Sequence, residues 1–267
     1  KVIEENLMTF NDEIKLKKNF EKKGMIFLST PFSLNAAKKL YKIGIKAFKI
    51  GSGECNNIPL LEKIASFKKP IILSTGMNDL KSIEKSVKVL EKSKVKYVLL
   101  HCKSEYPADI KNLKLDFINK LKKKFPKSLV GYSDHTIGTI ASISAMAKGA
   151  CVIEKHFTDT NKRKGPDIVC SMDPSELLFL NKAADVIFKS NGSNKKISRI
   201  EKITAKFAFS SVVSIKDIKK GEKFTLKNIW VKRPGTGFYP AYKIKNILGK
   251  KAKKKIIKDK FITKKDV

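Results

Sequence analysis

The sequence has few cysteines, and none of them forms a metal or redox motif. Four occur in 267 residues, and no two stand in a CxxC pair. This excludes the paired-cysteine zinc sites and thioredoxin-like redox centres that such spacing would indicate. A chain of this length can bury a stable core without disulfides, so we expect all four to be reduced thiols.

Long apolar runs are also missing. No stretch approaches the roughly 20 uncharged apolar residues that a transmembrane helix needs. Residues 1–20 lack the apolar core and the small-residue cleavage site of a signal peptide. We therefore expect a cytoplasmic protein with no membrane partner.

Arginine and acidic residues are scarce, whereas lysine is abundant. The formal net charge is +33, and only three of the 58 basic residues are arginines. Such a charge raises nucleic acid as a partner, because clustered cations displace counterions from phosphates. The lysines are instead spread along nearly every predicted helix, and no zinc-finger, RNP-like or helix-turn-helix pattern is present. We expect a solvated basic surface that attracts anionic substrates and has no nucleic-acid partner.

What the sequence does contain is a repeated unit, in which a short apolar strand ends in polar residues and a Lys-rich amphipathic helix follows. Six strands are predicted, at residues 26–30, 47–51, 71–75, 97–102, 129–133 and 152–157. Helices are predicted at residues 34–43, 80–93, 113–124, 137–148 and 174–189. Nearly continuous apolar strands that alternate with helices are typical of a parallel sheet covered by helices.

The polar residues favour one class of parallel sheet. They fall at or just past the carboxyl ends of many strands, which is where a TIM barrel builds its site, whereas a doubly wound sheet gathers its site at one point. The expected fold class is therefore α/β, a TIM (β/α)8 barrel. Because six of its eight strands are visible and the chain starts at Lys1, we expect about two N-terminal βα units to be missing.

The composition changes near residue 190. A polar stretch, SNGSNKK, is followed by short β-like runs and turn signals. The expected domains are a partial barrel at residues 1–189, a linker at 190–207 and a small β-rich domain at 208–267.

Two histidines follow consecutive predicted strands, His135 in YSDHT and His156 in EKHF. Adjacent strands would bring both imidazoles to one mouth of the barrel, where they suit a divalent ion such as Mn²⁺ or Zn²⁺. For each, a hydrogen-bonded core histidine is the alternative. For His101, in the apolar run YVLLHC, a core role and a substrate contact are equally open.

Hydroxyl groups, a lysine and glycines at several strand ends indicate a phosphate site. Its candidate residues are Thr30, Lys49, Ser52, Ser74 and Ser133. Glu54 follows in a glycine-rich turn, where an acid, a base, a sugar-hydroxyl acceptor or a surface salt bridge are all open. Asp167, in a GPD turn, either faces the barrel mouth or belongs to an ordinary turn.

Seven motifs, in this order, closely resemble the N-acetylneuraminate (sialic acid) synthase family: STPFS, FKIGSGE, ILSTGM, LHCKSEYP, GYSDHT, EKHF and KGPD. The tail resembles that family's antifreeze-like, or SAF, domain through DIKKGE and KRPGTG. The match covers essentially the whole chain.

The resemblance implies a domain-swapped homodimeric transferase. Such an enzyme condenses phosphoenolpyruvate with an N-acylated amino sugar and water, and it releases a nine-carbon 2-keto sugar acid and phosphate. N-acetylmannosamine and a 2,4-diacetamido-6-deoxyhexose both fit as the acceptor. A divalent metal is also implied, Mn²⁺ first, with Mg²⁺ or Co²⁺ as alternatives, to polarise the sugar aldehyde and then to activate water.

The resemblance also implies residue roles. His135 and His156 are the implied metal ligands and, with Glu54, the catalytic residues. The implied substrate-binding residues are Thr30, Lys49, Ser52, Ser74, Ser104, Tyr106, Ser133, Asp167 and, reaching the partner subunit, Arg233. The chain departs from the family at Lys103-Ser104, where a small polar pair is common, and at Ile168, where histidine is frequent.

Two rival hypotheses remain at this stage. One is an inactive, truncated barrel whose SAF domain binds carbohydrate, because missing strands leave unpaired sheet edges. The other is a phosphoenolpyruvate-dependent synthase of a shorter keto sugar, which fits the barrel but not the SAF-like tail.

Overall fold

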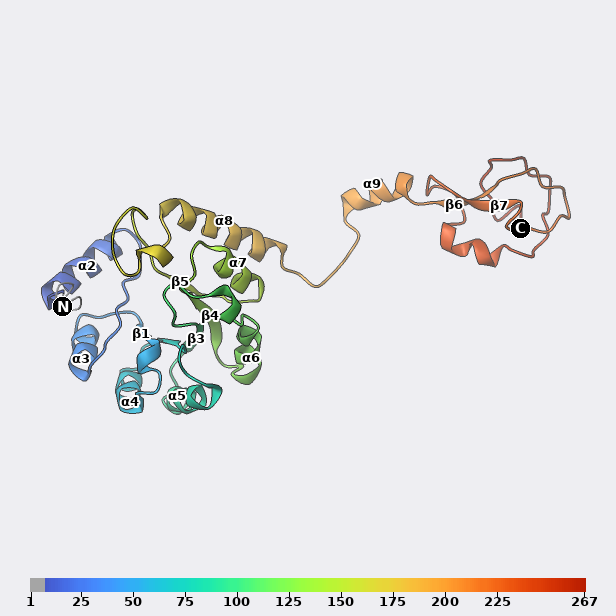
Figure 1. Cartoon of the computed structure of the whole chain (residues 1–267). Helices are drawn as coiled ribbons and strands as arrows, with labels where there is room; N and C mark the ends of the chain where they lie inside the picture. Colours follow the sequence, from blue (N-terminus) through green and yellow to red (C-terminus); the bar gives the residue numbers. More distant parts are fainter. Residues whose placement is uncertain (1–7) are drawn as a thin grey trace. The chain divides into compact units, whose positions relative to one another are not determined.

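The computed structural model describes residues 8–267, which divide into two compact units (Figure 1). Unit 1 ends at Asn191 and unit 2 begins at Gly192. Each unit buries its own apolar cluster. Among residues 8–267, no helix is long and apolar enough to cross a bilayer.

Unit 1 is built on one parallel sheet whose strands pair in chain order. The strands are β1 (Phe48–Ile50), β2 (Ile71–Ser74), β3 (Tyr97–Cys102), β4 (Leu129–Asp134) and β5 (Ile153–Lys155). The sheet curls, and the helices that connect its strands cover the outer side (Figure 1). The fold class expected from the sequence is confirmed, as a barrel built over part of its circumference.

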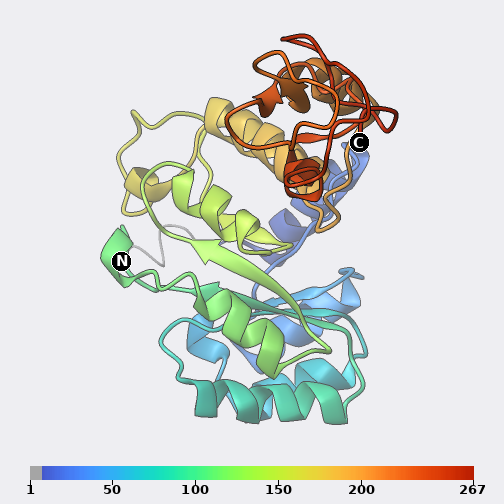
Figure 2. The ribbon, with the colours of Figure 1, turned by 90° about the vertical axis from the view of Figure 1, so that its right-hand side faces the viewer.

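Seven helices are described in unit 1. They are α2 (Phe10–Lys22), α3 (Leu34–Lys42), α4 (Ile58–Ser66), α5 (Leu80–Lys92), α6 (Phe117–Lys124), α7 (Ile140–Ala147) and α8 (Pro174–Ser190). In α5 the buried positions Ile83, Val87 and Leu90 recur at helical spacing and form its core-facing stripe. The Asp79 carboxylate accepts from Ser82 N at 2.7 Å and fixes the start of α5. Helices α4 and α5 pack side by side beneath the sheet (Figure 2).

The strand predicted at residues 26–30 is wrong. This segment has no strand hydrogen bonds, and β1 pairs only with β2. Phe27 packs against the core, whereas Ile26 is exposed. An apolar run becomes a strand only when a neighbouring strand accepts its hydrogen bonds, and none does so here within the described residues.

Unit 2 contains a small antiparallel sheet of β6 (Ser211–Ser214) and β7 (Ile229–Lys232). Further isolated bridges join the sheet to the C-terminal turns. The expected linker at 190–207 did not include a helix, but α9 (Arg199–Ala208) covers its second half. A capping box between Ser198 and Glu201 starts this helix, a signal that the polar composition around it obscured.

Candidate active site

Three rings meet at the carboxyl ends of β3, β4 and β5. His135 follows β4, His156 follows β5, and their ring centroids are 5.4 Å apart. The Tyr106 ring lies 4.2 Å from that of His135 and 5.8 Å from that of His156. The structure thus brings together three of the residues that the sequence singled out.

The two imidazoles have different electrostatic surroundings. Burial would lower the pKa of His135, but contacts with the Cys102 thiol and the Lys103 carbonyl outweigh it and raise that pKa. Burial lowers the pKa of His156, and the nearby Asp167 carboxylate offsets only part of this effect. His156 is therefore the more readily neutral imidazole, and the neutral form is the one that binds metals.

The donor groups at these strand ends fit a divalent metal. His135 Nδ1 lies 3.0 Å from the Lys103 carbonyl oxygen. When Nδ1–H donates to that oxygen, Nε2 keeps the lone pair that a metal requires. On the other side, ligand atoms of His156, Asp167 and Cys170 all lie within 4.8 Å of one another. Imidazole, carboxylate and thiolate are all ligands of borderline divalent ions.

A partly exposed ion pair occupies the expected phosphate site. Lys49 Nζ, on β1, lies 3.2 Å from Glu154 Oε2, on β5. The Ser133 hydroxyl donates to Glu154 Oε1 at 2.8 Å. Glu154 therefore joins two residues that were expected to bind phosphoenolpyruvate. Glu154 belongs to the EKHF motif, but its residue type and position in the sequence do not by themselves indicate a role.

A cavity of about 480 Å³ opens beside this pair. Thr30, Lys49, Glu154 and Lys155 line its polar part, and Ile72 and Leu100 are among its apolar lining residues. At the end of β2, Ser74 Oγ is buried and has no hydrogen-bond partner within residues 8–267. Because an unpaired buried hydroxyl is destabilising, Ser74 is a natural contact for a bound ligand.

Polar side chains also converge on Gly76. Its amide donates to Ser52 Oγ at 3.0 Å, and a side chain at this position would overlap Ser104 Oγ. Cys102 lies against the same point, with Sγ 3.7 Å from Ser104 Oγ. Burial would raise the pKa of Cys102, but hydrogen bonds with His135, Ser52 and Ser104 outweigh it and lower that pKa.

The remaining predicted residues lie in varied surroundings. Glu54 ends a short 3-10 turn, η1 (Ser52–Glu54), and accepts from Asn57 Nδ2 at 2.6 Å. Asp167 directly precedes a second 3-10 turn, η3 (Ile168–Cys170). Arg233 directly follows β7 and so belongs to unit 2.

His101 is a core residue. It is 9% exposed, its Nε2 lies 2.6 Å from the Leu113 carbonyl oxygen, and its ring packs beside those of Phe117 and Tyr132. Burial lowers its pKa, which keeps the ring neutral in this apolar setting. Of the two roles left open for His101, this geometry favours the structural one.

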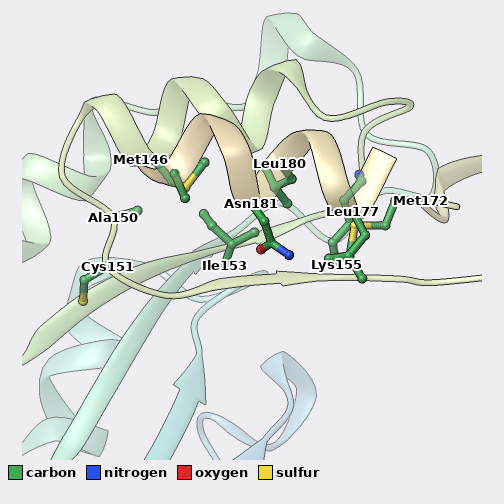
Figure 3. A pocket seen from close by; sticks show the side chains of 10 residues that line it. Met146, Ala150, Cys151, Ile153, Lys155, Met172, Leu177, Leu180 and Asn181 are labelled. Carbon is green, nitrogen blue, oxygen red and sulfur yellow. The ribbon is translucent and has the colours of Figure 1, made fainter. Parts of the chain in front are cut away.

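A second cavity, of about 290 Å³, lies between β5, α7 and α8 (Figure 3). Apolar side chains such as Met146, Leu177 and Leu180 make up most of its lining. None of the residues expected to bind substrate or metal lines it. A mostly apolar lining is typical of a packing gap between elements. We therefore place the candidate site at the cavity beside Lys49 and at the histidine cluster.

Comparison with known families divides the chain at nearly the same place as the structure. A model of the NeuB family matches residues 1–196, and a model of the SAF domain matches residues 209–267.

Relatives similar to this chain include proteins named as synthases of sialic and legionaminic acids. An N,N'-diacetyllegionaminic acid synthase of Campylobacter jejuni is 45% identical over 246 residues, which cover 91% of this chain and 73% of that protein. The enzyme of the same name from Legionella pneumophila is 38% identical, over 85% of this chain and 65% of its own length. A crystal structure of N-acetylneuraminic acid (sialic acid) synthetase from Leptospira borgpetersenii, in complex with citrate, matches with a TM-score of 0.70 and 34% identity. That match covers 74% of this chain and 70% of the synthetase.

Proposed function

The chain belongs to the NeuB family, and from this premise we propose that it condenses phosphoenolpyruvate with an N-acylated amino sugar. The enol carbon of phosphoenolpyruvate forms a bond to the sugar aldehyde carbon, water adds at the carbon that carries the phosphate, and phosphate leaves. The product is a nine-carbon 2-keto sugar acid. The observation that carries the proposal is the cavity lined by Thr30, Lys49 and Glu154, in a chain 45% identical to a named synthase of this type.

The phosphoenolpyruvate end of the site is assigned to the β1 and β2 side of the cavity. Lys49 supplies a cation, and Ser74 supplies a buried hydroxyl that has no protein partner among the described residues. Ser52 and Ser104, which meet at Gly76, add hydroxyl donors beside a backbone turn. Such a set of donors favours a doubly charged anion over a neutral sugar.

The amino-sugar end is assigned to Tyr106, Asp167 and Glu54, and Tyr106 packs against both histidines. His135 and His156 would hold a divalent metal, Mn²⁺ first and Mg²⁺ or Co²⁺ as alternatives. When bound, such an ion polarises a carbonyl oxygen and lowers the pKa of a water molecule. Tyr106, whose pKa is raised by burial, stays protonated and can donate to a sugar oxygen.

The acceptor that we propose is a 2,4-diacetamido-6-deoxyhexose, which would give an N,N'-diacetyllegionaminic acid. Two relatives named as N,N'-diacetyllegionaminic acid synthases, 45% and 38% identical to this chain, support it. N-acetylmannosamine is the competing acceptor, and the Leptospira synthetase supports it at 34% identity.

We further propose a homodimer in which Arg233 of each chain reaches the partner's barrel. Arg233 lies in a different compact unit from every other predicted site residue. A guanidinium group suits an acylamino oxygen because its planar donors are fixed in direction.

The test is phosphate release by the purified protein with phosphoenolpyruvate, Mn²⁺ and a panel of N-acylated amino sugars. We expect release with one sugar only, and a loss of about 100-fold or more in His135→Ala, comparable to removing one electrostatic contact in an active site. Lys85→Met, on the exposed side of α5, is the control and keeps full activity. A folded, metal-loaded protein that releases no phosphate with any sugar refutes the proposal.

A further inference from the structure

Cys170 lies at the histidine cluster although no role has been given to it. It ends the 3-10 turn η3 and is fully buried, and its Sγ lies with a nitrogen of His156 and a carboxylate oxygen of Asp167 inside a 4.8 Å group. His156 and Asp167 are both only partly buried, so the group is not sealed from solvent.

Backbone hydrogen bonds fix the positions of the two segments that bear these residues. Met172 N donates to the His156 carbonyl at 2.9 Å, and Thr158 N donates to the Met172 carbonyl at 2.9 Å. A parallel bridge joins Phe157 to Met172. Cys170 N also donates to the Asp167 carbonyl at 3.2 Å. These bonds therefore hold the backbone that bears the three side chains in one framework.

The current bonding of Cys170 leaves its sulfur available. Within residues 8–267, the Cys170 thiol donates one hydrogen bond, to the Asp167 carbonyl oxygen, with Sγ 3.3 Å from that oxygen. A thiol donates weakly, so this bond is easily exchanged for a stronger one. One imidazole, one carboxylate and one sulfur form a donor set that Zn²⁺ binds and that Mn²⁺, which prefers oxygen, does not favour.

We propose that Cys170 supplies a thiolate ligand to a divalent cation held by His156 and Asp167, and that this site takes Zn²⁺ or Co²⁺ more tightly than Mn²⁺. The thiol proton passes to water as the metal–sulfur bond forms. The inference rests on the proposed metal role of His156. It differs from the proposed function in two respects: Asp167 binds the cation rather than the sugar, and Zn²⁺ or Co²⁺ replaces Mn²⁺ as the ion that binds most tightly.

The experiment is an optical titration of the metal-free protein with Co²⁺. A bound thiolate gives an intense ultraviolet charge-transfer band, which ligation by nitrogen and oxygen alone does not give. We expect the band to reach its full height at one Co²⁺ per chain, and to be absent from Cys170→Ser. The matched controls Cys151→Ser, an exposed cysteine, and Cys102→Ser, beside His135, keep the band.

Competition between Zn²⁺ and Mn²⁺ for the metal-free protein measures which ion the site binds more tightly. We expect Cys170→Ser to lower the affinity for Zn²⁺ relative to Mn²⁺ by about 10- to 100-fold or more, since removing even an outer partner of a metal ligand has effects of that size. Asp167→Asn, which keeps the side-chain shape, is a second variant. It keeps the band and weakens Co²⁺ binding, so the proposal stays testable if Cys170→Ser fails to fold.

Three results overturn the proposal: a band that survives in Cys170→Ser, bound Co²⁺ without a band in the unaltered protein, or no Co²⁺ binding. Phosphate release is measured separately with Mn²⁺. Sugar-dependent release without a thiolate band refutes the role of Cys170 and leaves the proposed function standing.

Discussion

At the scale of single residues, the most consequential pair is Asp134 with Lys155. Their side chains are fully buried, and Lys155 Nζ lies 3.2 Å from Asp134 Oδ2. Asp134 also accepts from Thr136 N at 2.9 Å and from Ser142 Oγ at 2.6 Å. Each member directly precedes a candidate metal ligand, so the pair joins the two strand ends that carry His135 and His156.

Removing one charge of this pair destabilises the protein strongly. In Lys155→Met the Asp134 carboxylate loses its buried cation, at a cost of about 3–5 kcal/mol in the free energy of unfolding. Urea denaturation followed by far-ultraviolet circular dichroism measures it. The control Lys148→Met breaks an exposed pair with Asp116 and changes stability far less. Equal effects in the two variants would show that the buried pair does not hold these strand ends.

The sequence pointed to the histidines but not to the side chains that surround them. Lys49, His135 and His156 are predictable because their residue types and their positions at strand ends indicate phosphate binding and metal binding. The roles of their partners Glu154 and Lys155 are not predictable in this way, because the contacts of these two residues depend on which residues of neighbouring strands lie opposite each other. That register, such as Ser133 beside Glu154, is a property of the paired sheet.

At the scale of elements, apolar runs predicted strands well where both neighbours exist. The strand at 97–102 has the predicted bounds, and β2 and β4 each differ from prediction by one residue at one end. The failure at 26–30 occurred at the sheet's edge, where pairing decides the outcome. The helices α2, α4 and α9 were missed, although side-chain caps begin each of them. Local caps thus held more information than periodicity in these short segments.

The C-terminal turn of unit 2 depends on one carboxylate. Asp266 Oδ2 accepts from Thr263 N at 2.7 Å and from Thr263 Oγ1 at 2.6 Å, and Lys254 Nζ lies 3.0 Å from Oδ1. Burial alone would raise the pKa of Asp266, but these partners outweigh it and lower that pKa. A lowered folded-state pKa gives a stabilisation that is present above the unfolded pKa, about 3.8, and is lost as the pH falls through the folded value.

We therefore expect Asp266→Asn to destabilise unit 2 at pH 7 by about 1–3 kcal/mol, the usual effect of losing buried hydrogen bonds to a charged group. The difference from the unaltered protein shrinks as the pH falls below about 4, where Asp266 itself becomes protonated. Trp230, the single tryptophan and a residue of β7, reports unfolding of this unit by fluorescence. A difference that stays constant with pH would contradict the assignment.

At the scale of the whole molecule, the dominant property is the charge of +33. A positive surface raises the local concentration of anions, and added salt screens this effect over a Debye length of about 10 Å at 0.1 M. Phosphoenolpyruvate is an anion and the amino sugar is neutral, so the field distinguishes the two substrates of the proposed reaction.

Salt is therefore expected to affect the two substrates unequally. Raising the ionic strength from about 0.05 to 0.5 M shortens the Debye length severalfold. The KM for phosphoenolpyruvate should rise several-fold over this range, while the KM for the sugar stays nearly constant. Sucrose at matched osmolarity is the control. Parallel changes in both KM values would show that the surface charge does not guide the anion.

Because Lys49 is paired with Glu154, an incoming anion must compete with the Glu154 carboxylate for the Lys49 ammonium group. A carboxylate fixed 3.2 Å from the ammonium acts as a permanently tethered inhibitor, at a local concentration that no free buffer anion matches. A singly charged anion gains too little to displace it. We expect a ligand with both a phosphate and a carboxylate to have enough contacts to separate the pair, so that the proposed site would select its ligands by charge before shape is considered.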